Sequence, residues 1–240
     1  MKVIVGNEQE ISRLIAEEFI KQVNTKKNSV LGLATGTSPL GVYANLVQAC
    51  KEGRVSFKDV ATFNLDEYIG LEGTHEQSYR YFMNTNLFDH IDIDKAKTHV
   101  LKGTGDYLAY ANQYDAEIAS FGGIDLQILG IGSDGHIAFN EPGTSFDSLT
   151  HVAELAESTI VDNSRLFNDI SEVPTKAVTM GLKSIMNAKK IVLIATGKNK
   201  AKAIHDLLKG PKTIDVPCSI LQDHPDCTIY VDEDAYSLVK

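Results

Sequence analysis

Short, continuously apolar runs alternate with amphipathic segments along the chain, and this alternation limits the possible folds more than any other feature. Apolar runs of about four to eight residues are typical of parallel strands that are covered on both faces. Their alternation with helical patterns predicts an α/β fold, namely a doubly wound, mainly parallel, Rossmann-like sheet with helices on both faces. We expect strands at residues 30–34, 60–65, 124–131, 191–195 and 228–231.

Capping residues predict where several helices begin and end. Asn7 precedes a stripe of apolar residues at helical spacing, and Glu10 follows three positions later, as in a capping box. Asp106 is the expected N-cap of a later helix. A further helix from about Ala201 should stop at Gly210, which a proline follows.

Length and charge limit the classes of function. We find no linker, repeat or low-complexity tract in the 240 residues, so we expect a single domain over residues 1–240. The net charge of −9 argues against a nucleic-acid partner, because such proteins usually carry a basic surface. No apolar run approaches the roughly 18 residues of a membrane span, and the three cysteines lack a CxxC pair. We therefore expect a cytoplasmic protein without a membrane partner.

The predicted strand at residues 30–34 is followed by Thr35, Gly36, Thr37, Ser38 and Pro39. Ligands of doubly wound sheets bind at the carboxyl ends of strands, so these residues are candidates for a binding site. Ser38 is the expected N-cap of a helix and Pro39 its first residue. Free amides at such a helix start, together with three hydroxyls, favour phosphate binding over a plain tight turn.

Two adjacent acids, Asp66 and Glu67, follow the next apolar strand. A carboxylate at this edge of a sheet is a general base, a metal ligand or a solvated charge. Neighbouring side chains on a strand point in opposite directions, so at most one of the two should face a substrate.

Residues 130–145 are too rich in turn formers for a helix, and we expect a functional loop. They match the glycine spacing of a dinucleotide-binding fingerprint, but that motif must open a helix, so we reject this interpretation. The loop carries Asp134, His136 and Glu141. A histidine between two carboxylates suits a proton shuttle, whereas the same three residue types are also metal ligands.

The fourth strand is followed by Thr-Gly-Lys-Asn-Lys, whose last residue is Lys200, and Arg165 stands as an isolated cation. These groups place positive charge where a phosphate dianion could bind. The four strand ends together indicate proton-transfer chemistry on a sugar phosphate. They supply a phosphate loop, an acid that can act as a base, an acid–histidine–acid group and additional cations. The Gly-x-Ser-x-Gly pattern of a serine nucleophile is absent from the sequence.

Four blocks of sequence carry a resemblance to a known family. LGLATGTSP, FNLDEY, LGIGSDGHIAFNEPGTSF and TGKNKA, in this order, resemble the glucosamine-6-phosphate deaminases over essentially the whole chain. The resemblance implies a hydrolase-class enzyme that forms fructose 6-phosphate and ammonia from glucosamine 6-phosphate, without a metal or organic cofactor. Its partner would be a small-molecule sugar phosphate.

The resemblance also implies roles for individual residues. Asp66 would move a proton from C2 to C1, with Glu67 in a supporting role. His136 would open the pyranose ring, oriented by Asp134 and Glu141. The groups expected to hold the phosphate are those of Thr35, Gly36, Thr37, Ser38, Arg165 and Lys200.

Two departures from the regulated bacterial members concern allostery. Those members bind N-acetylglucosamine 6-phosphate through basic residues soon after the FNEP block, but residues 142–164 contain no lysine or arginine here. The sequence also stops at Lys240, without their longer tail. We therefore expect an unregulated enzyme that is a monomer or a small homo-oligomer.

The sequence leaves three alternative functions open. A 6-phosphogluconolactonase-type hydrolase has the same fold and binds a related ligand, but it has no need of a base at Asp66. A non-catalytic sugar-phosphate sensor should lack the proton-transfer residues, which are all present. A metal-dependent hydrolase would use Asp134, His136 and Glu141 as ligands.

Overall fold

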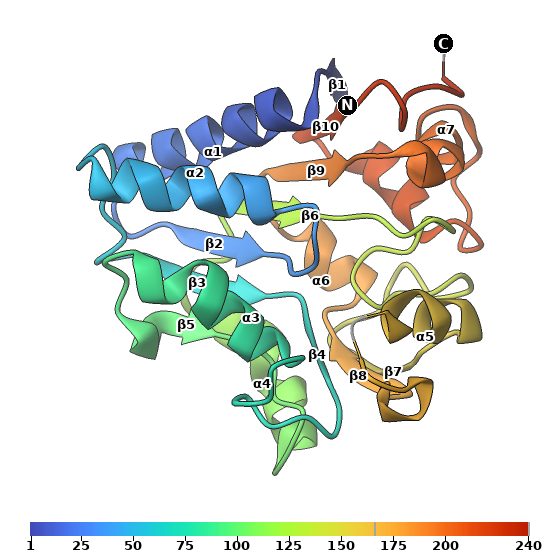
Figure 1. Cartoon of the computed structure of the whole chain (residues 1–240), viewed down its shortest axis with the longest axis horizontal. Coiled ribbons are helices and arrows are strands. Elements are labelled where there is room, and N and C mark those ends of the chain that lie inside the picture. The colour runs from blue at the N-terminus through green and yellow to red at the C-terminus, as the bar shows by residue number, and fades with distance from the viewer. Residues whose placement is uncertain (166, 240) are drawn as a thin grey trace.

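The computed structural model describes residues 1–165 and 167–239, so Leu166 and Lys240 of the expected 1–240 domain lie outside the described residues. Its larger sheet has seven strands in the order β1-β10-β9-β6-β2-β3-β5, and every neighbouring pair is parallel (Figure 1). The strands are β1 (Lys2–Val5), β2 (Val30–Leu33), β3 (Ala61–Asn64), β5 (Thr98–His99), β6 (Leu126–Leu129), β9 (Ile191–Ala195) and β10 (Cys227–Val231).

The predicted fold class is confirmed: the parallel sheet has helices on both faces, and all five predicted strands are present. Strands β1 and β5 were not predicted, because β1 is a half-exposed edge strand and β5 has two residues. The helices are α1 (Glu8–Thr25), α2 (Leu40–Lys51), α3 (Tyr79–Asn86), α4 (Tyr107–Ser120), α5 (Glu157–Ser164), α6 (Leu182–Met186) and α7 (Ala201–Lys209). Short 3-10 helices are η1 (Phe88–His90), η2 (Lys95–Lys97), η3 (Ile170–Glu172), η4 (Lys198–Lys200) and η5 (Pro217–Asp223).

The predicted helix boundaries agree with the structure at three helices. The Asn7 side chain accepts a hydrogen bond from the Glu10 amide at 2.9 Å, and Asp106 caps α4 in the same way. Helix α7 ends before Gly210, as predicted. Among the described residues, no helix is both long enough and apolar enough to cross a lipid bilayer.

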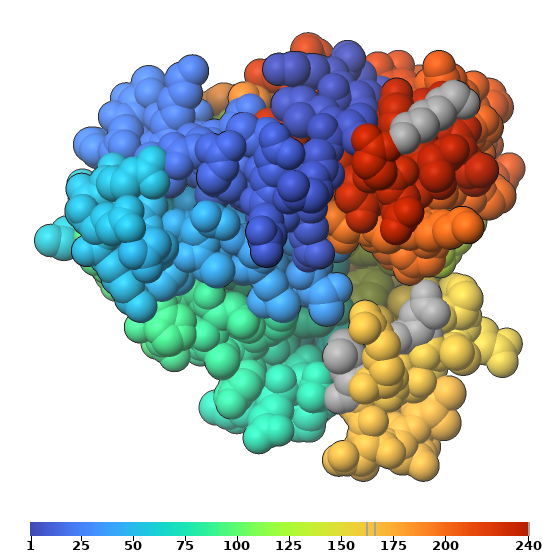
Figure 2. Space-filling view, turned by 45° about the horizontal axis from the view of Figure 1, so that its top comes forward, coloured from blue at the N-terminus to red at the C-terminus, as the bar shows by residue number. Residues whose placement is uncertain are grey.

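A second, smaller sheet was not predicted. It consists of the antiparallel strands β4 (Asp66–Tyr68), β8 (Lys176–Thr179) and β7 (His151–Glu154), in the order β4-β8-β7. Its apolar side chains form a separate small core that contains Tyr68, Phe139 and Ala177. In the space-filling view, the gold part of the chain, which includes η3, projects from the molecule, and a hollow separates it from the red C-terminal part (Figure 2).

The order of the strands determines where a ligand can bind. From β2 the chain adds β3 and β5 on one side, and it then returns to place β6 and β9 on the other side of β2. The direction of winding therefore reverses between β2 and β6. In open α/β sheets, the carboxyl ends of the strands at such a reversal bound the ligand crevice.

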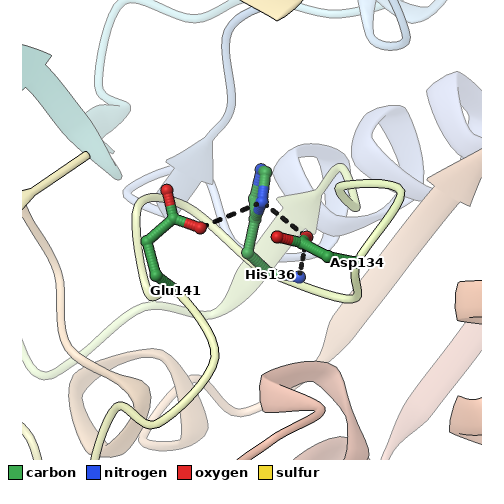
Figure 3. Close-up of side chains that lie close together, drawn as sticks. All are labelled: Asp134, His136 and Glu141. Atoms are coloured by element: carbon green, nitrogen blue, oxygen red, sulfur yellow. Dashed lines mark hydrogen bonds and ion pairs between the residues drawn. The ribbon is translucent and has the colours of Figure 1, made fainter. Parts of the chain in front are cut away.

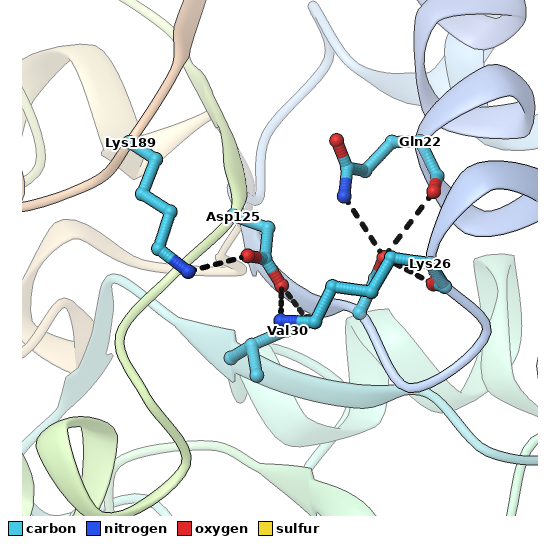
Figure 4. A network of polar contacts seen from close by, with 6 residues as sticks. Gln22, Lys26, Val30, Asp125 and Lys189 are labelled. Atoms are coloured by element: carbon cyan, nitrogen blue, oxygen red, sulfur yellow. Dashed lines mark hydrogen bonds and ion pairs between the residues drawn. The ribbon is translucent and has the colours of Figure 1, made fainter.

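The opposite, amino ends of β2 and β6 are joined by Asp125, which is 6% exposed (Figure 4). Its Oδ2 accepts hydrogen bonds from Lys26 Nζ at 2.6 Å and from the Val30 amide at 2.9 Å, and its Oδ1 accepts one from Lys189 Nζ at 2.7 Å. Burial alone would raise the pKa of Asp125, but the hydrogen bonds from Lys189, Lys26 and Val30 outweigh it and lower the pKa.

We expect Asp125→Asn to lower the free energy of unfolding by about 1–3 kcal/mol at neutral pH, because charge-assisted hydrogen bonds to a buried group are lost. Because the pKa of Asp125 is lowered in the folded protein, its carboxylate stabilises the fold above the unfolded pKa. This stability is lost as pH falls, so the difference between variant and wild type should shrink in acid. Urea unfolding at several pH values measures this. Asp89→Asn is the control, because Asp89 and its partner Lys95 are about half exposed. Equal effects of the two variants would contradict the prediction.

Candidate active site

A cavity of about 460 Å³ lies at the carboxyl ends of β2, β3, β6 and β9, which are neighbours in the large sheet. Four separate loops and the helix α5 contribute to its wall. Of the residues predicted from sequence, the lining includes Thr35, Gly36, Thr37, Ser38, Asp66, His136, Arg165 and Lys200.

The loop after β2 turns sharply at Gly36, whose φ of 90° favours glycine. The prediction that Ser38 caps α2 is wrong: Pro39 occupies the N-cap position, and no side chain caps the helix. The reason is that the first turn starts later, with the Thr37 carbonyl accepting the Leu40 amide and the Pro39 carbonyl accepting the Tyr43 amide. The Ser38 side chain therefore lines the cavity without serving as a cap.

Asp66 and Glu67 occupy adjacent positions on β4 and have different surroundings. Asp66 lines the cavity. Glu67 does not; its Oε1 accepts the amides of Tyr68 and Tyr79 at 2.9 Å, and its Oε2 accepts the Arg80 amide at 3.0 Å. Glu67 thus holds the first turn of α3, and this places Tyr79 in the cavity wall.

Burial changes the proton affinity of both carboxyls. It raises the pKa of Asp66 to about 8, with a smaller contribution from the charge of Glu67. Burial also raises the pKa of Glu67 to about 7, although the amides of Tyr79, Arg80 and Tyr68 act in the opposite direction. Asp66 can therefore gain and lose a proton near neutral pH, as a general base must.

His136 lies on the loop that follows β6, between two carboxylates (Figure 3). Its Nδ1 is 2.8 Å from Asp134 Oδ1 and 3.6 Å from Glu141 Oε2. A proton held on Nδ1 beside Asp134 leaves Nε2 as the ring nitrogen with a free lone pair. Since His136 lines the cavity, its ring can exchange a proton with a bound molecule.

The backbone conformation and close packing of this loop explain why it contains glycine at positions 132 and 135. A Cβ on Gly132 would lie 2.3 Å from the His136 ring, so only glycine permits this packing. Gly135 has φ 90°, and Ala138 is the one non-glycine residue with positive φ among the described residues. No helix follows the glycines, which agrees with our rejection of a dinucleotide-binding fingerprint.

The two carboxylates beside His136 are themselves held in place. Partial burial would raise the pKa of Asp134, but the hydrogen bonds and charge of His136 outweigh it and lower the pKa to about 2. Glu141 Oε1 accepts hydrogen bonds from Thr159 Oγ1 at 2.7 Å and from the Ala156 amide at 3.2 Å, which connects the loop to α5. Asp134, His136 and Glu141 offer ligand atoms within 4.8 Å of one another, a spacing that a divalent cation could also bridge.

Two cationic residues complete the wall: Arg165 follows the last turn of α5, and Lys200 ends η4. Sequence reasoning missed several polar lining residues. Thr196 and Asn199 belong to the strand-glycine turn that we had considered only for its lysines. No sequence motif marks Tyr79, Thr159 and Asn163 as cavity residues, because their positions in the wall depend on how α3 and α5 pack.

Comparison with known proteins agrees with this geometry. The model of the family "Glucosamine-6-phosphate isomerases/6-phosphogluconolactonase" matches residues 7–230. The chain is 53% identical to the glucosamine-6-phosphate deaminase of Thermoanaerobacter pseudethanolicus, over 100% of this chain and 95% of that protein. It is 48% identical to the corresponding enzyme of Clostridium perfringens, over 99% of both chains.

Solved structures extend the comparison. A monomeric glucosamine-6-phosphate deaminase superposes with a TM-score of 0.97 at 42% identity, over 99% of this chain and 100% of that one. The 6-phosphogluconolactonase of Trypanosoma brucei gives a TM-score of 0.79 at 18% identity over 100% of this chain and 98% of that one, which shows a shared fold alone. The chain therefore belongs to the glucosamine-6-phosphate isomerase/6-phosphogluconolactonase family, within which it is similar to the glucosamine-6-phosphate deaminases over its full length.

Proposed function

We propose that this protein converts glucosamine 6-phosphate into fructose 6-phosphate and ammonia. The observation that carries the proposal is that one cavity brings together a titratable carboxyl at Asp66, a histidine between two carboxylates and a loop suited to phosphate. The deaminase relatives, at about half identity over the whole chain, support the same reaction.

In the proposed mechanism, the sugar must first open. A closed pyranose has no carbonyl group, so its C2–H bond is not acidic. His136 accepts the proton of the C1 hydroxyl at Nε2 and returns a proton to the ring oxygen, which breaks the C1–O5 bond and forms the aldehyde. Asp134 and Glu141 both lie beside Nδ1, where they hold the ring and stabilise the cationic imidazolium.

Isomerisation then follows at Asp66. The carboxylate removes the C2 proton of the aldehyde, the C2–H electron pair forms a C1=C2 double bond, and O1 takes a proton from the C2 ammonium group, which gives an enolamine. The protonated Asp66 returns a proton to C1, which forms an imine at C2. Water hydrolyses this imine, which releases ammonia and leaves the ketone of fructose 6-phosphate. The loop of residues 35–38 with Arg165 and Lys200 would hold the phosphate throughout.

The alternatives fit this site less well. A lactonase has no use for a carboxyl in the position of Asp66, and burial of that group beside Glu67 is unfavourable unless the reaction needs it. A sensor requires no acid–histidine–acid arrangement. A metal-dependent hydrolase would use Asp134, His136 and Glu141, and it must lose activity when a chelator is present.

The decisive experiment measures ammonia and fructose 6-phosphate released from glucosamine 6-phosphate by the purified protein, with and without EDTA. Equal amounts of the two products in both samples are expected. Activity only without EDTA would favour the metal-dependent alternative. If neither sample releases ammonia, the proposal fails, and hydrolysis of 6-phosphogluconolactone would be the next assay.

The pH profile provides a separate prediction. Asp66 must be ionised to act as a base, and burial raises its pKa to about 8 in the free protein. We therefore expect kcat/KM to rise about tenfold per pH unit up to about pH 8, rather than to level off near pH 4. Initial rates at fixed low substrate between pH 5 and pH 9 measure this limb. A profile that is flat between pH 5 and pH 8 would contradict a raised pKa at Asp66.

We also propose that the enzyme is monomeric and unregulated. Residues 142–164 contain no lysine or arginine that could bind a phosphorylated effector, and the relative with TM-score 0.97 is monomeric. Sedimentation with substrate present should give a single species near 26.2 kDa, and the substrate curve should be hyperbolic. A sigmoidal curve that N-acetylglucosamine 6-phosphate makes hyperbolic would overturn this proposal.

A further inference from the structure

Asp232, the first residue after β10, is bound to the loop that follows the neighbouring strand β9. Its two carboxylate oxygens accept the Gly197 amide at 3.1 and 2.9 Å. Oδ1 also accepts the Ala235 amide at 2.8 Å, and the Asp232 carbonyl accepts the Tyr236 amide. All of these donors are backbone groups, so the carboxylate fixes chain segments and does not itself line the cavity.

Gly197 is the point from which the cationic turn starts. Its φ of 90° requires glycine, and its carbonyl accepts the Lys200 amide at 3.0 Å. The cavity is lined by Thr196, which precedes Gly197, and by Asn199 and Lys200, which follow Lys198. The hydrogen bonds thus form a continuous chain from Asp232 through Gly197 to Lys200.

We propose that Asp232 is a positioning residue, which orients the turn of residues 196–200 so that this turn can bind the phosphate of the substrate. The inference rests on the proposed function in one respect only, namely that the anion bound there belongs to a sugar phosphate. A carboxylate suits this task because a charged acceptor binds an amide more strongly than a neutral one. It also occupies the Gly197 amide, which fixes the orientation of that peptide.

Two variants of Asp232 and one matched control test the proposal. Asp232→Ala removes the acceptor, whereas Asp232→Asn keeps one amide oxygen for the Gly197 amide. Asp234→Asn makes the same change of charge at an exposed residue two positions later. For each protein we would measure kcat, KM for glucosamine 6-phosphate and the inhibition constant of inorganic phosphate.

We expect Asp232→Ala to raise KM and the phosphate inhibition constant together by about tenfold, with kcat changed by less than about threefold. Asp232→Asn should give a smaller rise of about threefold, and Asp234→Asn should match wild type. A merely structural role would instead reduce the folded fraction, which lowers kcat and leaves both other constants unchanged. That result, or equal constants in all four proteins, would overturn the proposal.

Direct calorimetry of inorganic phosphate binding separates this inference from the proposed function. If the wild-type protein binds phosphate but releases no ammonia from glucosamine 6-phosphate, the proposed function fails while Asp232 can still be tested. In that case, weaker phosphate binding by Asp232→Ala than by Asp234→Asn supports the positioning role. Equal binding by these two variants contradicts it.

Discussion

Replacement of Asp66 by asparagine is expected to lower kcat by about 10³-fold or more while making the protein more stable. Asparagine has nearly the same shape but cannot accept the C2 proton, and a positioned base is worth about 10²–10⁴-fold. Ring opening at His136 and phosphate binding should be unaffected, so KM should change little. Steady-state kinetics, together with deuterium exchange at C2 of the substrate in heavy water, would measure the loss.

The gain in stability follows from the sign of the pKa shift. Burial raises the pKa of Asp66 to about 8, so folding takes up a proton at any pH between the unfolded pKa and about 8. The stability associated with this group is present below the unfolded pKa and is lost as pH rises through about 8. Asparagine does not ionise, so the Asp66→Asn variant does not lose this stability. We expect its free energy of unfolding to exceed that of wild type by about 1–3 kcal/mol at pH 8.

Thermal unfolding at pH 5 and pH 8 tests the predicted gain in stability of Asp66→Asn. The variant and wild type should differ more at pH 8 than at pH 5. Asp89→Asn, at an exposed surface pair, should change neither stability nor turnover. An inactive Asp66→Asn protein that is also destabilised would contradict the prediction, because its inactivity would then reflect a damaged fold.

Replacement of His136 by glutamine should have the second largest effect, but at a different step. Glutamine cannot pass a proton between O1 and O5, so turnover of glucosamine 6-phosphate is limited by the small open-chain fraction already in solution. We expect kcat/KM to fall about 10²–10⁴-fold. Proton transfer at Asp66 remains possible once an open-chain molecule binds.

The reverse direction distinguishes the two residues. In heavy water with ammonium present, wild type should incorporate deuterium at C1 of fructose 6-phosphate. Asp66→Asn should lose this exchange, whereas His136→Gln should keep more of the exchange than of its forward turnover. Equal losses in both assays would show that His136 does more than open the ring.

Much of the fold could be predicted because its strands are short, apolar and fully buried. Strands β2, β3, β6 and β9 are buried along their whole length, and this leaves mainly apolar runs in the sequence. The same reasoning located the site, since parallel strands bring their carboxyl ends to one edge. Asp66, His136 and Lys200 follow three such strands and line one cavity.

The small sheet could not be predicted for a physical reason. Strand β4 has three residues, two of which are carboxylic acids, and its burial depends on pairing with β8 and on the packing of Tyr68 in the small core. Strands β7 and β8 are four residues long and include His151, Glu154 and Lys176. Their pairing is set by tertiary contacts, so neither composition nor periodicity reveals it.

The error at Ser38 has a similar origin. A serine before a proline is a good helix start by local criteria. Here the preceding turn at Gly36 directs the chain along the cavity, and the helix begins two residues after Ser38. The sequence pattern therefore predicted the position of the loop correctly, but it predicted Ser38 as a helix cap although this residue lines the cavity.

The division of the cavity between two sheets has a consequence for evolutionary change. Leu65 joins the sheets, because its amide bonds the Leu33 carbonyl of β2 and its carbonyl accepts the Met180 amide that follows β8. Three of the loops that line the cavity, those of residues 35–38, His136 and Lys200, follow strands of the large sheet, whereas Asp66 begins a strand of the small sheet and Arg165 follows α5 between β7 and β8. Mutations that reshape the small sheet can thus move Asp66 while they leave the loop of residues 35–38 and Lys200 in place. A duplicated gene could in this way acquire a new reaction on phosphorylated sugars while its product kept most of the groups proposed to hold the phosphate.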